Sequence, residues 1–119
     1  MKIRIKGNSL RFRLTRSEVE KLDQTGMVEE QVNFGDNVLS YAIVRATQPE
    51  LSASFSGSRI TIYFPAAMME EWVHTDRVGF DHDTAGSLYL LVEKDFTCLD
   101  NVAEDQSDQY PNPLLKRSL

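Results

Sequence analysis

The sequence has little of what extracellular, metal-binding and membrane proteins use. Its 119 residues include one cysteine, Cys98, which excludes an intrachain disulfide and any zinc site built from several cysteines. The longest run of large apolar residues covers positions 88–92, far short of the roughly 20 residues that cross a bilayer. No continuous apolar stretch follows the basic first residues, so no secretory signal is predicted. We therefore expect a cytoplasmic protein with no membrane partner.

The chain also lacks the common catalytic motifs. There is no Gly-rich phosphate loop, no GxSxG and no HExxH. Asp81-His82-Asp83 is interpreted as a turn between strands, because on an extended segment the two carboxylates would face away from the imidazole. Cys98 is interpreted as a small buried residue. We expect no metal and no cofactor, catalytic residues stay unknown, and enzymatic activity remains an open question.

Charge is unevenly distributed along the chain. The net charge is −5, yet residues 1–21 carry seven basic and two acidic side chains, while residues 22–119 carry six basic and sixteen acidic ones. Overall acidity argues against nucleic-acid binding. The opposed charges of the two segments favour contact within the molecule or between subunits, so a homodimer is one expected assembly.

Residues 2–6 and 9–14 predict a β-hairpin. Apolar and basic side chains alternate in both segments, and Gly7-Asn8 suits a two-residue type II′ turn between them. After the hairpin, Thr15-Arg16-Ser17-Glu18 has the pattern of a helix capping box. The short helix should end by Gly26, with strands following at 27–34 and 38–46.

The same plan recurs fifty residues later. When residues 1–28 are aligned without gaps to the residues fifty positions later, nine of their ten apolar positions align with an apolar residue, where chance would give about five. Gly57-Ser58 takes the place of Gly7-Asn8, and a second helix should begin near Pro65. We interpret this as a duplicated ββαββ unit, residues 1–46 and 51–94.

The predicted fold class is α+β. About eight strands, the last near 87–94, should form one mostly antiparallel sheet, open or closed into a barrel, with two helices packed on it as a single domain of residues 1–94. Residues 95–119 are expected to form an acidic, extended tail that packs on the body through Phe96, Cys98 and Tyr110, because Pro111 and Pro113 exclude helix and central strand.

The basic hairpin is the strongest candidate site. A two-residue turn places Arg4 opposite Arg11 and Lys2 opposite Arg13, so like charges oppose each other on one face. Carboxylates such as Glu93, Glu29 or those within 100–108 can neutralise this face. Alternatively, the guanidiniums bind a phosphate or carboxylate anion, or the acidic surface of a partner. The candidate anion-binding residues are Lys2, Arg4, Arg11 and Arg13.

Several stretches together resemble a family of short bacterial proteins that form a domain of unknown function. These stretches are 1–9, 14–19, 92–96, 98–99, 104–108 and 111–113. The resemblance implies a stand-alone bacterial protein and carries over no catalytic residues. The duplicated layout is also similar to the triphosphate tunnel enzymes, but their opening Glu-x-Glu-x-Lys pattern is replaced here by Lys2-x-Arg4-x-Lys6.

Two functions follow from the sequence as hypotheses. The first is a non-catalytic binding or interaction module. The second is an anion-binding protein or phosphoester enzyme that uses the basic hairpin face, with a small anionic ligand as its partner.

Overall fold

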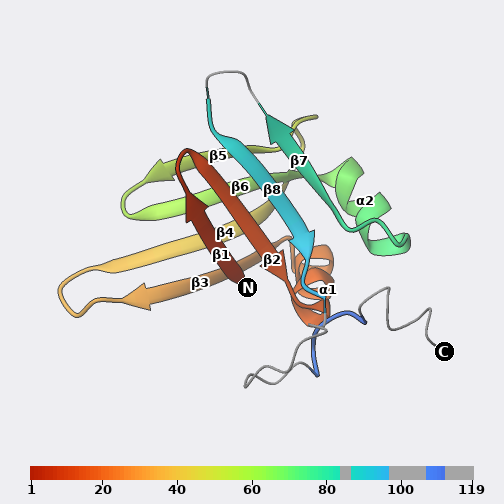
Figure 1. The fold of residues 1–119 in the computed structure, drawn as a ribbon, viewed down its shortest axis with the longest axis horizontal. Helices are drawn as coiled ribbons and strands as arrows, with labels where there is room; N and C mark the ends of the chain where they lie inside the picture. Colours follow the sequence, from red (N-terminus) through yellow and green to blue (C-terminus); the bar gives the residue numbers. More distant parts are fainter. Residues whose placement is uncertain (84–86, 97–106, 112–119) are drawn as a thin grey trace.

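The protein is built from two four-stranded sheets and two helices (Figure 1). The computed structural model describes residues 1–83, 87–96 and 107–111. Each half of the chain has the element order ββαββ. The elements are β1 (Lys2–Lys6), β2 (Ser9–Leu14), α1 (Arg16–Thr25), β3 (Met27–Asn33), β4 (Val38–Ala46), β5 (Ser52–Ser56), β6 (Arg59–Pro65), α2 (Ala66–His74), β7 (Gly79–Asp83) and β8 (Tyr89–Lys94).

Two-residue turns set the register of the first hairpin of each half. Gly7 has a φ of 54° while Asn8 has a negative φ, as the predicted type II′ turn requires. In the second half, Gly57 and Ser58 both have a positive φ, of 57° and 61°, which is typical of a type I′ turn. In both hairpins the two residues that flank the turn pair directly with each other. Ser58, however, adopts a conformation that a residue with a Cβ rarely takes.

The two helices begin where the sequence predicts but are capped differently. The Thr15 hydroxyl accepts from the backbone N–H of Glu18, whose carboxylate accepts from the N–H of Thr15, so the capping box is confirmed. Helix α1 ends at Gly26, which has a left-handed φ of 84°. Helix α2 has Pro65 as its N-cap residue, with no side-chain cap.

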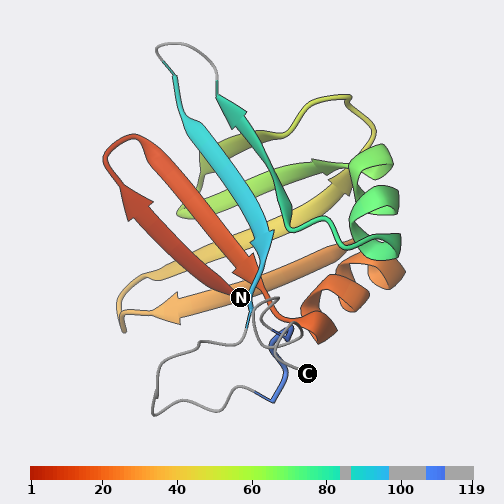
Figure 2. The same cartoon turned by 45° about the vertical axis from the view of Figure 1, so that its right-hand side comes forward.

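Each sheet combines a hairpin from one half of the chain with a hairpin from the other. The strand orders are β1-β2-β8-β7 and β3-β4-β6-β5, and the central pairs, β2 with β8 and β4 with β6, are parallel. The α+β class is confirmed, and the pairing within each hairpin is antiparallel. The eight strands form two mixed sheets, however, so the prediction of one sheet or a closed barrel is wrong. The sheets cross and diverge towards their hairpin turns (Figure 2), so no backbone ladder joins them within the described residues.

The core lies between the inner faces of the two sheets, and both helices close one end of it (Figures 1 and 2). Trp72 of α2 stacks on Phe64 at 5.1 Å and donates from its indole N–H to the Val78 carbonyl. Strand directions put the β1–β2, β3–β4 and β5–β6 turns at the opposite end, which neither of the two described helices covers. None of the described helices is long and apolar enough to cross a membrane.

Candidate functional site

The outer face of the β1-β2-β8-β7 sheet carries the predicted basic cluster. The observed register confirms that Arg4 lies opposite Arg11 and Lys2 opposite Arg13. The residues that pair with each other across the four strands form rows on this face. Along these rows the side chains change from basic on β1 and β2 to acidic on β7. The rows are Lys2-Arg13-Glu93-Gly79, Arg4-Arg11-Leu91-Asp81 and Lys6-Ser9-Tyr89-Asp83.

Carboxylates from β8 and its end neutralise part of this cluster. The Oε1 of Glu93 accepts from the Nε of Arg11 at 2.6 Å and from the Nε of Arg13 at 3.2 Å. The buried carboxylate of Asp95 lies 3.3 Å from the Lys2 ammonium. Of the carboxylates that the sequence offered, Glu93 fills this role, whereas Glu29 pairs with Arg59 on the other sheet.

A glycine leaves room for this arrangement. Gly79 is the β7 neighbour of Glu93, and a Cβ at this position would lie 2.2 Å from the Val92 carbonyl oxygen and 2.7 Å from the Cβ of Glu93. Any larger residue would therefore push β7 away from β8.

Arg4 differs from the other three basic residues of the cluster because no described carboxylate neutralises its guanidinium. Among the described residues no carboxylate lies within ion-pair distance of its guanidinium, and its side chain is exposed. Together with Lys2, Arg11 and Arg13 it lines a hollow of about 220 Å³ on the outer face. The four predicted residues are thus brought together, three of them already paired with carboxylates.

Residues 107–110 pack beside this face, against the start of α1 and the end of β8. The Asp108 carboxylate accepts from the hydroxyl of Ser17 at 2.5 Å and from its N–H at 3.3 Å; the Ser17 hydroxyl bond is the main reason that the pKa of Asp108 is lowered. The Tyr110 ring packs against Phe96 with the ring centroids 5.9 Å apart and the planes tilted by 55°, and the Tyr110 N–H donates to the Asp95 carbonyl. Cys98 lies outside the described residues.

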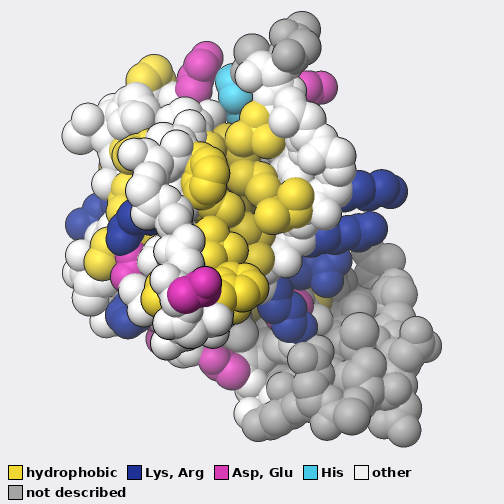
Figure 3. Space-filling view, turned by 90° about the vertical axis from the view of Figure 1, so that its left-hand side faces the viewer, with side chains coloured by type: hydrophobic (Ala, Val, Ile, Leu, Met, Phe, Trp, Pro, Cys, Tyr) yellow, Lys and Arg dark blue, Asp and Glu magenta, His cyan; other side chains and the backbone are white. Residues whose placement is uncertain are grey.

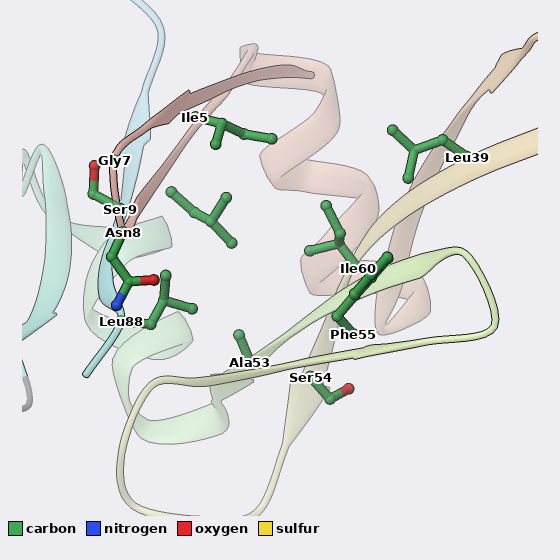
Figure 4. A pocket seen from close by; sticks show the side chains of 11 residues that line it. Ile5, Gly7, Asn8, Ser9, Leu39, Ala53, Ser54, Phe55, Ile60 and Leu88 are labelled. Atoms are coloured by element: carbon green, nitrogen blue, oxygen red, sulfur yellow. The ribbon is translucent and has the colours of Figure 1, made fainter.

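A second surface opens between the two sheets, at the end away from the helices. We call it the mouth. It is a groove of about 440 Å³ whose apolar lining comes from both sheets: Ile5, Leu10, Leu39, Ala53, Phe55, Ile60 and Leu88. Figure 4 shows the labelled apolar side chains of both sheets around one shared space. Figure 3 shows a continuous apolar band across this face, with basic side chains at its edge.

Two large apolar side chains of the mouth are mostly exposed to water. Ile5 is 62% exposed and Phe55 is 72% exposed, although both continue the inner faces that are buried further inside. The polar groups on the rim are neutral: Asn8, Ser9 and Ser54. Among the described residues that line the mouth, none has a titratable side chain.

The other candidate residues do not form a site in the described part of the chain. Asp81, His82 and Asp83 lie within strand β7, not in a turn, and their side chains alternate as extended backbone requires. The Asp81 carboxylate accepts from the Tyr89 hydroxyl at 3.1 Å; partial burial and this bond raise the pKa of Tyr89. No three described His, Cys, Asp or Glu side chains are placed to hold a metal.

The mouth was not predicted from the sequence, because the alternation around Ile5 and Phe55 indicates only half-buried strands. A signal was present: both residues come two positions before the glycine of a tight turn, where a strand is about to leave the sandwich. The divergence of the sheets, which decides their exposure, has no local sequence pattern.

Comparison with known proteins identifies the family but no activity. Residues 1–114 match a family described as "Family of unknown function (DUF7009)", and the chain belongs to this family. No curated protein matches the chain. No solved structure matches it either.

Proposed function

We propose that this protein is a non-catalytic interaction module that binds apolar side chains of a polypeptide in its mouth. The observation that carries the proposal is the exposure of Ile5 and Phe55 at the open end of a sandwich whose inner faces are otherwise buried. Contiguous apolar surface on a folded chain is typical of an interaction site. The neutral hydrogen-bonding groups of the rim suit the main chain of a bound segment.

The experiment measures whether the mouth is an accessible apolar site. Nile red, a neutral dye that fluoresces in apolar surroundings, is titrated with the folded protein and with Phe55→Ser. The proposal expects strong fluorescence with the wild type and loss of most of it with Phe55→Ser. Val78→Ser is the matched control, because Val78 is 43% exposed but lies beside α2 at the far end. Equal fluorescence of all three proteins would overturn the proposal.

The basic outer face supports a second candidate function, the binding of a phosphate or carboxylate anion. It rests on the Arg4 guanidinium, which has no carboxylate partner among residues 1–83, 87–96 and 107–111, and on the hollow that Lys2, Arg11 and Arg13 also line. A guanidinium fork binds such anions by two parallel hydrogen bonds. A phosphoester enzyme would need, in addition, a base or a metal at this hollow.

A thermal-shift titration with phosphate, pyrophosphate and triphosphate tests anion binding. An anion at about 100 times its Kd adds about 2.7 kcal/mol of stability to the folded state. Arg4→Ala should abolish this shift without lowering the melting temperature in the absence of anion, since Arg4 has no carboxylate partner in the described chain and lies opposite Arg11. Wild-type protein that shows no shift at millimolar anion would retire this function.

The duplication also remains a proposal. It is supported by the repeated element order and by equivalent hydrogen bonds: the Tyr89 N–H donates to the Asn8 carbonyl, and the Ser40 N–H donates to the Ser58 carbonyl. We further infer one domain for residues 1–94, with 95–119 as a tail packed on it, and a bacterial, cytoplasmic protein.

A further inference from the structure

We propose that the occupant of the mouth is a second copy of this chain, whose β3–β4 turn inserts into it. This rests on the proposed function of the mouth and names its partner. In a two-fold dimer each copy then supplies one knob and one groove, which is the self-complementarity that such an interface needs.

The β3–β4 turn has the shape and the chemistry of a knob. It spans residues 34–37 and is the leftmost part of the molecule in Figure 1. Phe34, at its start, is 68% exposed, and its N–H donates to the Asn37 carbonyl at 2.8 Å, which holds the turn closed. Val32, which pairs with Leu39 of the mouth, is also exposed and joins the knob to the groove. An aromatic side chain on a closed turn loses little conformational entropy when it is buried.

The apolar surface is as large as a stable dimer needs. With about 150–250 Å² for a large side chain, the exposed parts of Phe34, Phe55, Ile5 and Val32 amount to roughly 400–600 Å². A standard interface buries about 800 Å² per partner, of which somewhat more than half is apolar. This surface therefore supplies the apolar core of one standard interface.

Charges on the knob and beside the mouth are complementary. Asp36 lies in the β3–β4 turn, and Lys6 lies directly before the Gly7-Asn8 turn, on the outer face of its sheet next to the mouth. Both are exposed, and neither has an ion-pair partner among the described residues. When the knob of one copy enters the mouth of the other, Asp36 approaches Lys6 twice in the dimer. Such rim charges set the register and the partner choice of an interface.

Sedimentation equilibrium of the full chain tests the self-association. We expect a concentration-dependent dimer with a micromolar Kd, and an increase of the Kd by at least about 30-fold in Phe34→Ser, as for other buried aromatic anchors. Val78→Ser, with a comparable apolar residue removed outside the mouth, should leave the Kd unchanged. Equal melting temperatures of Phe34→Ser and the wild type at monomeric concentration would show that the fold is intact.

Charge exchange identifies the partner as this chain itself. Asp36→Lys and Lys6→Asp should each weaken the homodimer, because each opposes like charges twice. Mixing the two variants should restore association, since both contacts of the mixed dimer are attractive. A cyclised peptide of residues 32–39 should displace Nile red from the mouth, and the same peptide with Phe34→Ser should not.

The outcomes separate this inference from the proposed function. A wild type that stays monomeric at millimolar concentration, or a dimer that Phe34→Ser leaves intact, overturns the inference. If such a protein still binds Nile red in a Phe55-dependent manner, the mouth takes a different polypeptide. If it does not bind the dye, both the inference and the proposed function fail.

Discussion

Glu93 is expected to hold the basic face together, and Glu93→Gln tests this. The variant keeps the shape of the side chain and removes its charge. Arg11 and Arg13 then face Arg4 and Lys2 on β1 without the β8 carboxylate to which both now donate. Four cations would then share one side of two adjacent strands, and like charges directly opposite each other destabilise a sheet.

The expected loss of stability in Glu93→Gln follows from the burial of Glu93 and its two arginine partners. The Glu93 side chain is 13% exposed, while those of Arg11 and Arg13 are 32% and 39% exposed. Exposed ion pairs contribute about 0–1 kcal/mol, whereas removing one partner of a fully buried pair costs about 3–5 kcal/mol. Because these two pairs are intermediate, we expect Glu93→Gln to lower the free energy of unfolding by about 2 kcal/mol.

Urea unfolding at low and high salt measures the effect. At about 1 M salt the Debye length falls to about 3 Å, so the gap between variant and wild type should narrow as the repulsion is screened. Adding Arg11→Met to Glu93→Gln should recover part of the loss, since one unpaired cation is removed. The control is Glu71→Gln, whose pair with Arg77 is exposed on both sides; it should change stability by less than about 0.5 kcal/mol. A Glu93→Gln variant as stable as this control, or a gap that salt does not narrow, would refute the reasoning.

Three further predictions concern the turns and two titratable groups. Ser58→Gly should stabilise the protein by about 0.5–1 kcal/mol because it relieves a positive φ, whereas Asn8→Gly, where φ is negative, should destabilise it; changes of equal sign in urea unfolding would contradict this. The pKa of Asp108 is lowered, so its contribution to stability is present above pH 3.8 and is lost as the pH falls below that value. The melting temperatures of the wild type and Asp108→Asn should therefore converge in acid. Burial and the hydrogen bond to Glu30 raise the pKa of Tyr41 from 10 to about 12. The wild type should therefore lose its greater stability over Tyr41→Phe between pH 10 and 12. A stability difference that stays constant over this range would count against the bond to Glu30.

Local features of this fold could be predicted from the sequence because few residues determine them. A two-residue turn fixes the pairing of both strands that it joins, so the register of Lys2 with Arg13 followed from Gly7-Asn8 alone. The capping box followed in the same way from Thr15 and Glu18, which are three residues apart.

The pairing of distant strands could not be predicted. Strand β2 pairs with β8 across about 80 residues, and Leu10 and Leu90 would fit many other partners equally well by hydrophobicity. The choice of Glu93 as the neutralising carboxylate depends on this same parallel pairing, so it was one of several options until the strand order was known. Exposure of the mouth depends on the angle between the sheets, which results from all the packed side chains together.

The two halves of the chain show which features the fold itself requires. Positions that hold Arg4 and Arg11 in β1 and β2 hold Ser54 and Thr61 in β5 and β6, and that hairpin forms with the same register. The charges of the first hairpin are therefore dispensable for folding, and their presence calls for a role on the surface, whether towards Glu93 or towards an anion.

At the mouth, in contrast to the outer face, the two halves of the chain have the same type of residue at equivalent positions. Ile5 and Phe55 occupy equivalent positions in the two halves, as do Leu10 and Ile60, and all four are apolar. Leu10 and Ile60 are buried, so packing accounts for them, but packing does not account for Ile5 and Phe55, which are largely exposed. A serine at either position would cost the isolated fold little and would remove an exposed apolar side chain that favours aggregation. That both halves nevertheless present a large apolar residue at the same rim supports the proposal that a partner buries them, and it favours the mouth over the basic face as the proposed site.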